Sequence, residues 1–416
     1  MKIAVIGGGP AGLMAAYWAG INGDLVTIYE RNEKIGKKLY ITGKGRCNVT
    51  NNAPMEDFMS HYINNSRFLY SAVTKFDNTR LTYFLEDHGT KTKVERGGRV
   101  FPVSDKASDV TKAFYTALKV VDPDYEYNKR VKRILTEENG DTVKVKGIEL
   151  YNGHKAAYDK VIVATGGMSY PATGSTGDGY KFAEELGINV IPPSPGLVPV
   201  VLSDKEIPGL EGLSLKNVEL NFTYGRKKSF KMKGEMIFTH DGISGPIALF
   251  ASSVIGRSLN DGPVSGFIDL KIALSPDELD RRIIREVKNA PKRHLKSLMR
   301  TLLPERLVDP FLDKAGLDPE KGNSDLTILD RRKIISFLKH YPITATGIRS
   351  FKEAIITQGG IDTKEINPHT MESRKVKGLY FAGEVIDYDG TTGGYNIQAA
   401  VSTGYLAGCS ASGAEA

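Results

Sequence analysis

Residues 2–20 of the chain read KIAVIGGGPAGLMAAYWAG, and this stretch decides the fold. It opens with a short β-branched apolar run, which is typical of a buried parallel strand. Gly7, Gly9 and Gly12 follow in the spacing G-x-G-x-x-G, and small residues dominate the segment after them. In such a unit the glycines permit a tight turn, close approach of a pyrophosphate, and packing of helix on strand. The stretch predicts a Rossmann-like α/β unit that binds a dinucleotide.

A second predicted strand, LVTIYE at residues 25–30, ends in the acid Glu30. Its carboxylate would accept hydrogen bonds from an adenosine ribose, and its charge would repel a 2′-phosphate. The helix between the two strands would offer free N–H groups and a positive dipole end to phosphates. The alternative is a glycine-rich turn that only packs, which leaves the acid at the strand end unexplained.

A second strand–loop–helix pattern lies at residues 378–408, near the other end of the sequence. GLYFAGE predicts a strand ending in Glu384, and a glycine loop then leads into a helix beginning near Gly394. A cofactor that uses both ends of the chain indicates FAD, with ADP at the first pattern and isoalloxazine at the second. Glu384 would bond ribityl hydroxyls, and the helix N-terminus would favour flavin reduction. A glycine loop before a buried helix is the alternative.

A third piece, VIVATGGMSY at residues 161–170, predicts another strand of the same sheet passing close to the cofactor. No second G-x-G-x-x-G follows a strand in the middle of the chain. A dedicated NAD(P)H domain is therefore not predicted, and NAD(P)H stays open as a transient electron donor.

Composition narrows the class further. The 416 residues are 40% hydrophobic and 25% charged, typical of a globular protein, with no apolar run of membrane-spanning length. The first apolar run is too short for a signal peptide, so we expect a cytoplasmic protein. Cys47 and Cys409 lie far apart without metal-ligand spacing, so no metal is predicted. Residues 281–306 carry a net charge of +7, so the rest of the chain is about neutral. The positive charge is therefore local, which weakens any argument from the overall charge for a nucleic-acid partner.

From residue 192 the composition changes, and proline-rich sequence indicates a domain crossing. Alternating stretches at 217–225, 229–238 and 265–274 predict antiparallel strands of a small barrel. Ser275 and Glu278 then form a capping box with Pro276 at the first helical position. We predict an FAD-binding domain at 1–192 and 343–416, a β-barrel-like domain at 193–274, and a small helical domain at 275–342.

The motifs GGGPAG, ITGKGRCNVTN, GEMIFTHDGISGP and FAGEVIDYDGTTGGYNIQAA together resemble one family of bacterial and archaeal flavoproteins. These are NAD(P)/FAD-dependent oxidoreductases, and they include aminoacetone oxidases and a bile-acid reductase acting on conjugated ketones. The resemblance covers nearly the whole chain. It implies a two-dinucleotide-binding type of FAD domain interrupted by a barrel-like domain and a helical domain.

In such a fold the loop ITGKGRCNVTNN, residues 41–52, runs along the pyrophosphate toward the flavin. Arg46 and Asn48 are expected to contact the cofactor there. Cys47 has no second cysteine beside it, so no dithiol relay forms and a structural thiol is expected. The predicted cofactor contacts are Gly7, Gly9, Pro10, Ala11, Gly12, Glu30, Arg31, Lys38, Gly45, Arg46, Asn48, Val131, Ala164, Thr165, Gly166, Gly383, Glu384, Asp387, Gly394, Tyr395, Asn396 and Ile397.

His240, in FTHDGISGP, is the candidate catalytic residue because it titrates near neutral pH, although it could equally cap the turn. The predicted function is transfer of a hydride between flavin and a small carbonyl, enone or amine substrate. Oxygen or NAD(P)H would be the electron partner. The alternatives are a tRNA-modifying flavoprotein that uses the basic helices as its platform, and a flavin-binding protein with a structural or sensing role. Oligomeric state stays open.

Overall fold

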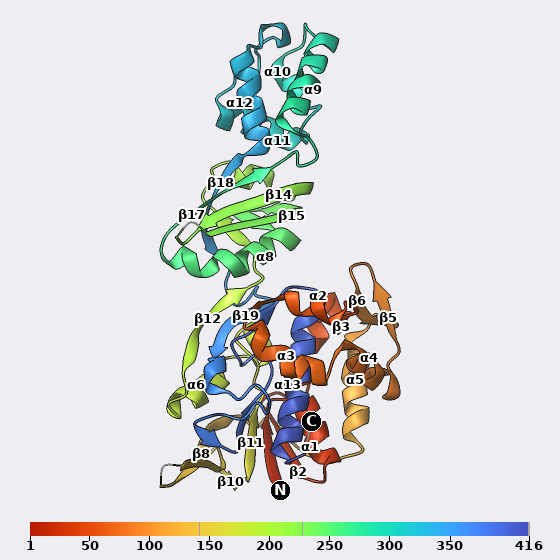
Figure 1. The fold of residues 1–416 in the computed structure, drawn as a ribbon, viewed down its shortest axis with the longest axis vertical. Coiled ribbons are helices and arrows are strands. Elements are labelled where there is room, and N and C mark those ends of the chain that lie inside the picture. The colour runs from red at the N-terminus through yellow and green to blue at the C-terminus, as the bar shows by residue number, and fades with distance from the viewer. Residues whose placement is uncertain (141, 227, 415–416) are drawn as a thin grey trace. The chain divides into compact units, whose positions relative to one another are not determined.

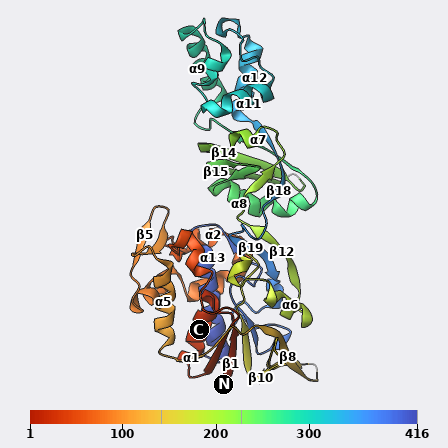
Figure 2. The same ribbon diagram turned by 180° about the vertical axis from the view of Figure 1, so that it is seen from behind.

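The computed structural model describes residues 1–140, 142–226 and 228–414. These residues form two compact units (Figures 1 and 2). The first unit contains Met1–Pro195 and Phe351–Ala416, and the second contains Gly196–Ser350. Both ends of the chain belong to the first unit, as the sequence predicted for the FAD-binding part.

A five-stranded sheet forms the centre of the first unit, in the order β21-β11-β1-β2-β7. All four pairings are parallel. The strands are β1 (Lys2–Ile6), β2 (Leu25–Glu30), β7 (Asp124–Tyr127), β11 (Lys160–Val163) and β21 (Leu379–Phe381). The predicted strands at 3–6, 25–30, 161–163 and 379–381 are thus confirmed. Because β1 is buried between β11 and β2, its apolar run is explained by burial on both faces.

Helices α1 (Pro10–Ile21) and α13 (Tyr395–Ala411) pack against each other, backbone to backbone. A Cβ on Gly404 of α13 would lie 2.2 Å from the carbonyl oxygen of Ala11, so only glycine permits this crossing. The views from both sides place the two helices together against the sheet. Small residues in both segments, predicted to serve close packing, therefore bring the two ends of the chain together.

Smaller elements surround this sheet. Three further sheets contain β3 (Thr50–Asn51), β5 (Thr92–Glu95) and β6 (Arg99–Pro102); β4 (Tyr62–Asn64) and β22 (Asp389–Gly390); and β8 (Val131–Asn139), β9 (Thr142–Leu150), β10 (Lys155–Ala157) and β20 (Val376–Lys377). Strands β12 (Val190–Gly196) and β19 (Ile356–Ile361) pair with each other. The other helices are α2 (Met55–Ser60), α3 (Ser66–Lys75), α4 (Asn78–Asp87), α5 (Ala107–Leu118) and α6 (Asp178–Glu185).

The second unit contains a closed antiparallel barrel, in the order β13-β16-β15-β14-β17-β18. Its strands are β13 (Val200–Leu202), β14 (Ser214–Tyr224), β15 (Lys228–Thr239), β16 (Gly242–Ser244), β17 (Val264–Asp269) and β18 (Tyr341–Ile348). The barrel-like insertion is thus confirmed. The sequence interpretation assigned residues from 343 to the FAD-binding domain, whereas β18 pairs with β13 and β17 in the barrel. The division into three domains itself stays a prediction.

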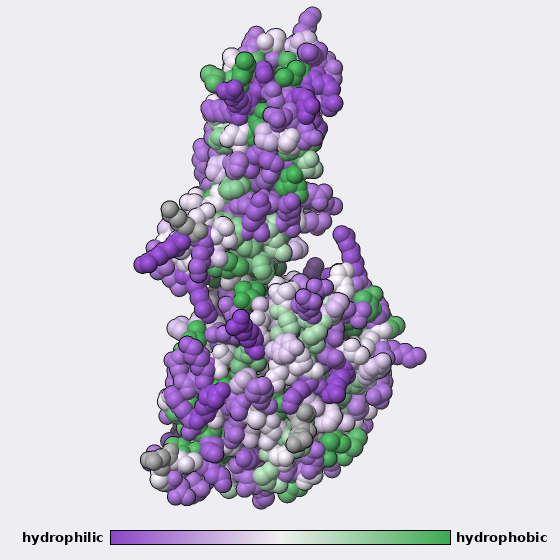
Figure 3. Space-filling view, in the orientation of Figure 1, coloured by the Kyte–Doolittle hydropathy of each residue, from purple (hydrophilic) through white to green (hydrophobic). Residues whose placement is uncertain are grey.

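Helices complete the second unit: α7 (Ile207–Leu210), α8 (Pro246–Ile255), α9 (Pro276–Asn289), α10 (Leu295–Met299), α11 (Glu305–Ala315) and α12 (Ile328–Lys339). The capping box at the start of α9 is confirmed, because Ser275 accepts from Glu278 N–H while Glu278 accepts from Ser275 N–H. Hydrophilic side chains dominate the visible face over α9–α12 (Figure 3). Within the described residues, no helix is both long and apolar enough to cross a membrane.

Candidate functional site

A cavity of about 760 Å³ lies in the first unit, at the carboxyl ends of the parallel strands. It is bounded by the glycine turn after β1, the end of β2, the loop at 42–48, the turn after β11 and the segment before α13. The N-termini of both α1 and α13 line it. A helix N-terminus presents unpaired N–H groups and positive partial charge, so each end of the cavity favours negative charge.

The two N-termini mark separate ends of the cavity. Ala11 of α1 crosses α13 at Gly404, which is nine residues after Tyr395. At about 1.5 Å per helical residue, the start of α13 lies roughly 13 Å along the helix from this crossing. The cavity therefore suits a long ligand with two polar regions.

At the α1 end, Gly9 leaves room for a ligand, since a Cβ built on it would meet nothing within 4 Å. Gly7 has φ 110° and packs on Ala164, where a Cβ would lie 2.4 Å from the carbonyl oxygen. Glu30 is 8% exposed and accepts hydrogen bonds from Gly8 N–H at 2.9 Å and Asn32 N–H at 2.8 Å. Its carboxylate is thus fixed at the end of β2, with lone pairs left for hydroxyl donors.

At the α13 end, Gly394 has φ 101° and sits against the backbone of Thr50, so no side chain fits there. Gln398 N–H makes the first bond within the helix, to Gly394 O at 3.0 Å. The amides of residues 395–397 consequently lack an intrahelical acceptor. The Asn396 side chain bonds both the N–H and the carbonyl of Gly390, and so holds the preceding loop in place.

Lys38 and Glu384 form an ion pair on the cavity wall. Lys38 Nζ lies 2.6 Å from Glu384 Oε2 and donates to Ser169 Oγ at 2.6 Å. Ser169 Oγ and Thr357 N–H both donate to Glu384 Oε1, at 2.9 and 2.7 Å. This network joins the loop after β2 to the strand-end acid predicted from the C-terminal pattern.

Among the buried polar atoms on the cavity wall, Asn48 Oδ1 and Thr165 Oγ1 have no hydrogen-bond partner in the described part of the chain. Buried polar atoms normally have a partner, so these two indicate a bound ligand with polar groups. A Gly9 cradle, a fixed ribose acceptor and two helix N-termini facing one cavity fit a dinucleotide with an electron-rich ring at its far end. The residues present therefore fit FAD.

Most of the predicted cofactor contacts line this cavity. They are Gly7, Gly9, Pro10, Ala11, Glu30, Arg31, Lys38, Arg46, Asn48, Val131, Ala164, Thr165, Gly166, Gly383, Glu384, Gly394, Tyr395, Asn396 and Ile397. Contact with the cofactor stays a prediction for each of them.

Three predicted contacts are not on the cavity wall: Gly12, Gly45 and Asp387. Gly12 faces the turn after β1, where a Cβ would lie 1.9 Å from the carbonyl oxygen of Gly7. Gly45 has φ 85° and shapes the loop instead. Asp387 is 7% exposed, and Asn65 donates to its carbonyl and its carboxylate. These three residues do not line the cavity, but they support the segments that do.

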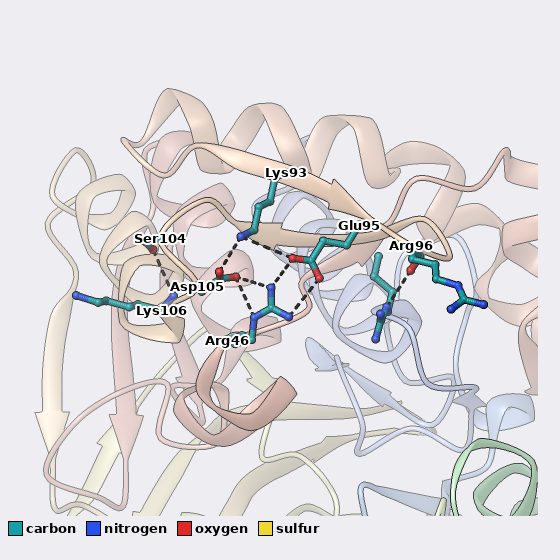
Figure 4. Close-up of polar contacts among 8 residues, drawn as sticks. Arg46, Lys93, Glu95, Arg96, Ser104, Asp105 and Lys106 are labelled. Carbon is teal, nitrogen blue, oxygen red and sulfur yellow. Dashed lines mark hydrogen bonds and ion pairs between the residues drawn. The ribbon is translucent and has the colours of Figure 1, made fainter. Parts of the chain in front are cut away.

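Arg46 lines the cavity, but carboxylates hold its guanidinium (Figure 4). It donates to Asp105 Oδ1 at 2.9 Å and to both oxygens of Glu95, and it lies 4.1 Å above the ring of Phe101. Lys93 donates to Asp105 Oδ2 at 2.7 Å. Arg46 lowers the pKa of Glu95, and Lys93 with Arg46 lowers the pKa of Asp105. The cluster ties the loop at 42–48 to the β5–β6 hairpin.

Cys47 is fully buried, and burial raises the pKa of its thiol to about 11. It is therefore a neutral thiol at pH 7, which agrees with the structural role expected from the sequence. His240 lies in the second unit, where its side chain is 74% exposed and within 3.4 Å of a Glu211 oxygen. Its catalytic role stays a prediction that no contact in its own unit supports.

Sequence reasoning missed His61, which lines the cavity at the α13 end. Its ring stacks on Tyr395 at 4.1 Å with 13° between the planes, and its Nδ1 lies 2.9 Å from Thr391 Oγ1. Burial lowers the pKa of His61. The residue lies in HYINN before β4, with no motif around it. The pairing of β4 with β22 and the hydrogen bond from Thr391 N–H to the His61 carbonyl bring it to the cavity.

The fold and this cavity define a class: the protein is an FAD-dependent oxidoreductase of the Rossmann type. The chain belongs to the HI0933-like protein Rossmann domain family, which it matches over residues 1–410.

Three relatives cover nearly the whole chain. It is 32% identical over 412 residues to the ribosomal RNA dihydrouridine synthase of Haemophilus influenzae, covering 98% of each protein. It is 32% identical to the protein of the same name from Escherichia coli, covering 96% of this chain and 95% of that one. It is 29% identical to the 3-dehydro-bile acid delta(4,6)-reductase of Clostridium scindens, covering 98% of each.

Among solved structures, the fold is similar to a 3-ketosteroid-delta4-(5alpha)-dehydrogenase from Rhodococcus jostii. The TM-score is 0.53 at 15% identity, with 99% of this chain and 97% of that chain covered. A 3-ketosteroid delta1-dehydrogenase from Sterolibacterium denitrificans gives a TM-score of 0.53 at 13% identity, with 99% of each chain covered. At such low sequence identity, these two similarities concern the fold alone.

Proposed function

We propose that this protein reduces a carbon–carbon double bond conjugated with a carbonyl group. The observation that carries the proposal is His61 on the wall of a cavity that fits FAD, beside the helix N-terminus expected to face the flavin. The names of the full-length relatives support it. A 3-dehydro bile acid with Δ4,6 double bonds is a conjugated ketone. Dihydrouridine formation saturates the uracil C5–C6 bond, which is conjugated with the C4 carbonyl.

Bound FAD, once reduced, supplies a hydride to the β-carbon of such a substrate. The α-carbon must then gain a proton, which the chain has to provide. When the Thr391 hydroxyl donates to Nδ1 of His61, the ring proton is on Nε2. Because burial lowers the pKa of His61, the imidazole is neutral at pH 7 and keeps this single proton. His61 thus holds a transferable proton on the cavity wall.

The proposed cofactor ligands follow from the two ends of the cavity. Glu30 would accept the ribose hydroxyls, and the α1 N-terminus with Gly9 would hold the pyrophosphate. Asn48 and Thr165 would bond polar groups through their unpartnered oxygens. The amides at the start of α13 would face the electron-rich edge of the ring. NAD(P)H is the proposed electron donor.

The test is anaerobic reduction of the purified FAD-loaded protein with NADH or NADPH, followed by mixing with cyclohex-2-enone or with cyclohexanone. We expect the enone to restore the oxidised flavin spectrum and the saturated ketone to leave it reduced. A fully loaded protein whose flavin no conjugated carbonyl reoxidises would refute the proposal.

His61→Gln should slow reoxidation by the enone about 10²- to 10⁴-fold, the usual contribution of a positioned acid. FAD content should stay unchanged. His154→Gln is the matched control, since His154 is exposed in the same unit. Equal rates for His61→Gln and the wild type would assign the proton to another group.

A second candidate is reduction of uracil within RNA, favoured by the two dihydrouridine synthases that match from end to end. The basic helices of the second unit supply part of a platform. Lys296 and Arg300 are paired with Asp309 and Glu305. Arg281, Lys288 and Lys292 have no carboxylate within 4 Å in the described chain. Binding of a ribosomal RNA fragment that weakens steeply from 50 to 200 mM salt would support this candidate. No binding at 50 mM would eliminate it.

A further inference from the structure

Four cations lie in or near the β5–β6 hairpin, and three of them, Lys44, Arg46 and Arg99, line the cavity, but only two of the four are neutralised. Arg46 and Lys93 share Glu95 and Asp105, so this cluster has no net charge (Figure 4). Lys44 and Arg99 also line the cavity, and neither has a carboxylate within 4 Å in the described chain. Both side chains are exposed. Two positive charges are therefore left over at this place.

Arg99 lies beside an aromatic ring, and the backbone next to Lys44 approaches the same ring. The Arg99 guanidinium carbon lies 5.8 Å from the centre of the Phe101 ring. A Cβ on Gly43, next to Lys44, would lie 3.5 Å from the same ring. Lys44 itself has φ 58°, a left-handed conformation that costs a non-glycine residue roughly 1 kcal/mol or more. The neutral cluster at Arg46, two residues further on, ties this loop to Glu95 and Asp105.

Arg99 lies at the α13 end of the cavity. Asn51 pairs with Arg99 between β3 and β6, and its Nδ2 donates to Gly97 O at 3.0 Å and to Gly393 O at 3.2 Å. Gly393 precedes Gly394, the residue before the start of α13. The α1 N-terminus, where the pyrophosphate of FAD is expected, lies roughly 13 Å away along α13. Arg99 is therefore separate from the proposed pyrophosphate site, and Lys44 is next to Gly43, which faces the Phe101 ring on the same strand as Arg99.

We propose that Lys44 and Arg99 form an anion subsite for a phosphate ester carried by the molecule that meets the flavin. Arg99 would bind two phosphate oxygens with its planar guanidinium, and Lys44 would add a point charge. Two ligands share this chemistry: an RNA phosphodiester next to the reacting base, and a phosphate of the nicotinamide nucleotide. The subsite deepens the proposed function, since it concerns the same cavity, but it makes no use of His61.

The experiment compares Arg99→Gln and Lys44→Gln with the control Arg96→Gln. Arg96 lies in the same hairpin turn and is exposed, but it does not line the cavity. FAD-loaded protein is titrated with a short uridine-containing RNA and, separately, with NADPH, at 50 and 200 mM salt. Flavin content and the flavin midpoint potential are measured for every variant.

We expect Arg99→Gln and Lys44→Gln each to weaken binding of one or both probes about tenfold, because a charge-assisted bond to phosphate is lost. For RNA, the slope of log Kd against log salt should fall by about 0.7 per cation removed. Arg96→Gln should change neither value. Weakening of RNA alone identifies the phosphodiester as the source, and weakening of NADPH alone identifies the nucleotide.

Unchanged affinity for both probes in both variants would overturn the subsite. Loss of FAD or a shifted midpoint potential without weaker probe binding would also overturn it, since the cations would then serve the cofactor. The proposed function fails separately. Weaker RNA or NADPH binding in a protein that reduces no conjugated carbonyl would leave the subsite standing and refute the reaction.

Discussion

Each unit of the molecule holds a lysine between polar partners, and the two lysines differ in what lies beside them. In the first unit, Lys38 contacts Glu384 and Ser169 on the wall of the cavity. In the second unit, Lys314 lies 2.6 Å from Asp204 and also contacts Glu206. The lysines are similarly buried, at 23% and 20% side-chain exposure, so burial alone does not distinguish them.

The difference lies in the partners. Asp204 and Glu206 are only 11% and 9% exposed. They also accept from Thr344 N–H at 2.8 Å and from the Tyr341 hydroxyl at 2.9 Å, which joins β18 to α11. Glu384 is 21% exposed and borders the cavity. The cluster at Lys314 therefore stabilises the barrel and its helices, whereas the pair at Lys38 offers polar atoms to a ligand.

The substitution expected to have the largest effect on stability is Lys314→Met. It leaves two buried carboxylates without their cation, which costs about 3–5 kcal/mol of unfolding free energy. The chain has one tryptophan, Trp18, and it lies in the first unit, so its fluorescence reports that unit alone. In urea, we expect circular dichroism to show an earlier transition while the Trp18 transition stays in place.

Lys205→Met is the matched control for this experiment. Lys205 pairs with Asp313 at 2.9 Å in the same unit, but both side chains are more than half exposed. Exposed pairs contribute between 0 and about 1 kcal/mol, so the control should unfold like the wild type. A Lys314→Met protein that also unfolds like the wild type would show that the buried cluster contributes no stability.

Glu384→Ala tests the cavity side of the comparison. It removes the acceptor of Lys38 and Thr357 N–H, and with it the proposed ribityl ligand. We expect FAD affinity to fall about 10- to 100-fold, with a much smaller effect on unfolding of the apoprotein than Lys314→Met has. Flavin absorbance per protein after gel filtration measures the affinity loss. Glu33→Gln, in an exposed pair with Lys37, should retain FAD fully.

A smaller effect is expected for the ion pair between Lys321 and Asp330, which lies at the start of α12 in the second unit. Lys321, at 2.6 Å, lowers the pKa of Asp330 from 3.8 to about 2. A lowered pKa stabilises the folded state above pH 3.8, and this contribution disappears as the pH falls through about 2. Asp330→Asn should therefore lower Tm at pH 6 and have little effect near pH 2. An equal loss at both pH values would exclude the charge as the cause.

The smallest effect is expected for Cys47→Ser. The buried thiol is neutral at pH 7, so serine should preserve both FAD content and turnover within about twofold. Loss of turnover in a variant that keeps FAD would show that the thiol takes part in the reaction.

The strand–glycine–helix patterns at both ends of the chain could be predicted because each is a local signal. Gly9 and Gly394 line the cavity as expected: Gly9 leaves room for a ligand, and Gly394 has φ 101° and lies against the backbone of Thr50. Arg46 shows the limit of this reasoning. Its position on the cavity wall was predictable, but the carboxylates that bind it come from a hairpin about fifty residues away.

By itself, the sequence determined the class of fold, the cofactor and two segments that line the cavity, because glycine spacing and strand-end acids act over a few residues. Only the tertiary structure decided which charges are free. His61 and Arg99 lie in no motif, and the loop motif that contains Lys44 does not show whether its charge is neutralised. Their importance depends on which side chains reach the cavity and which carboxylates neutralise their neighbours. Such neutralisation acts over a few ångströms in space between residues far apart in the chain, so no local pattern records it.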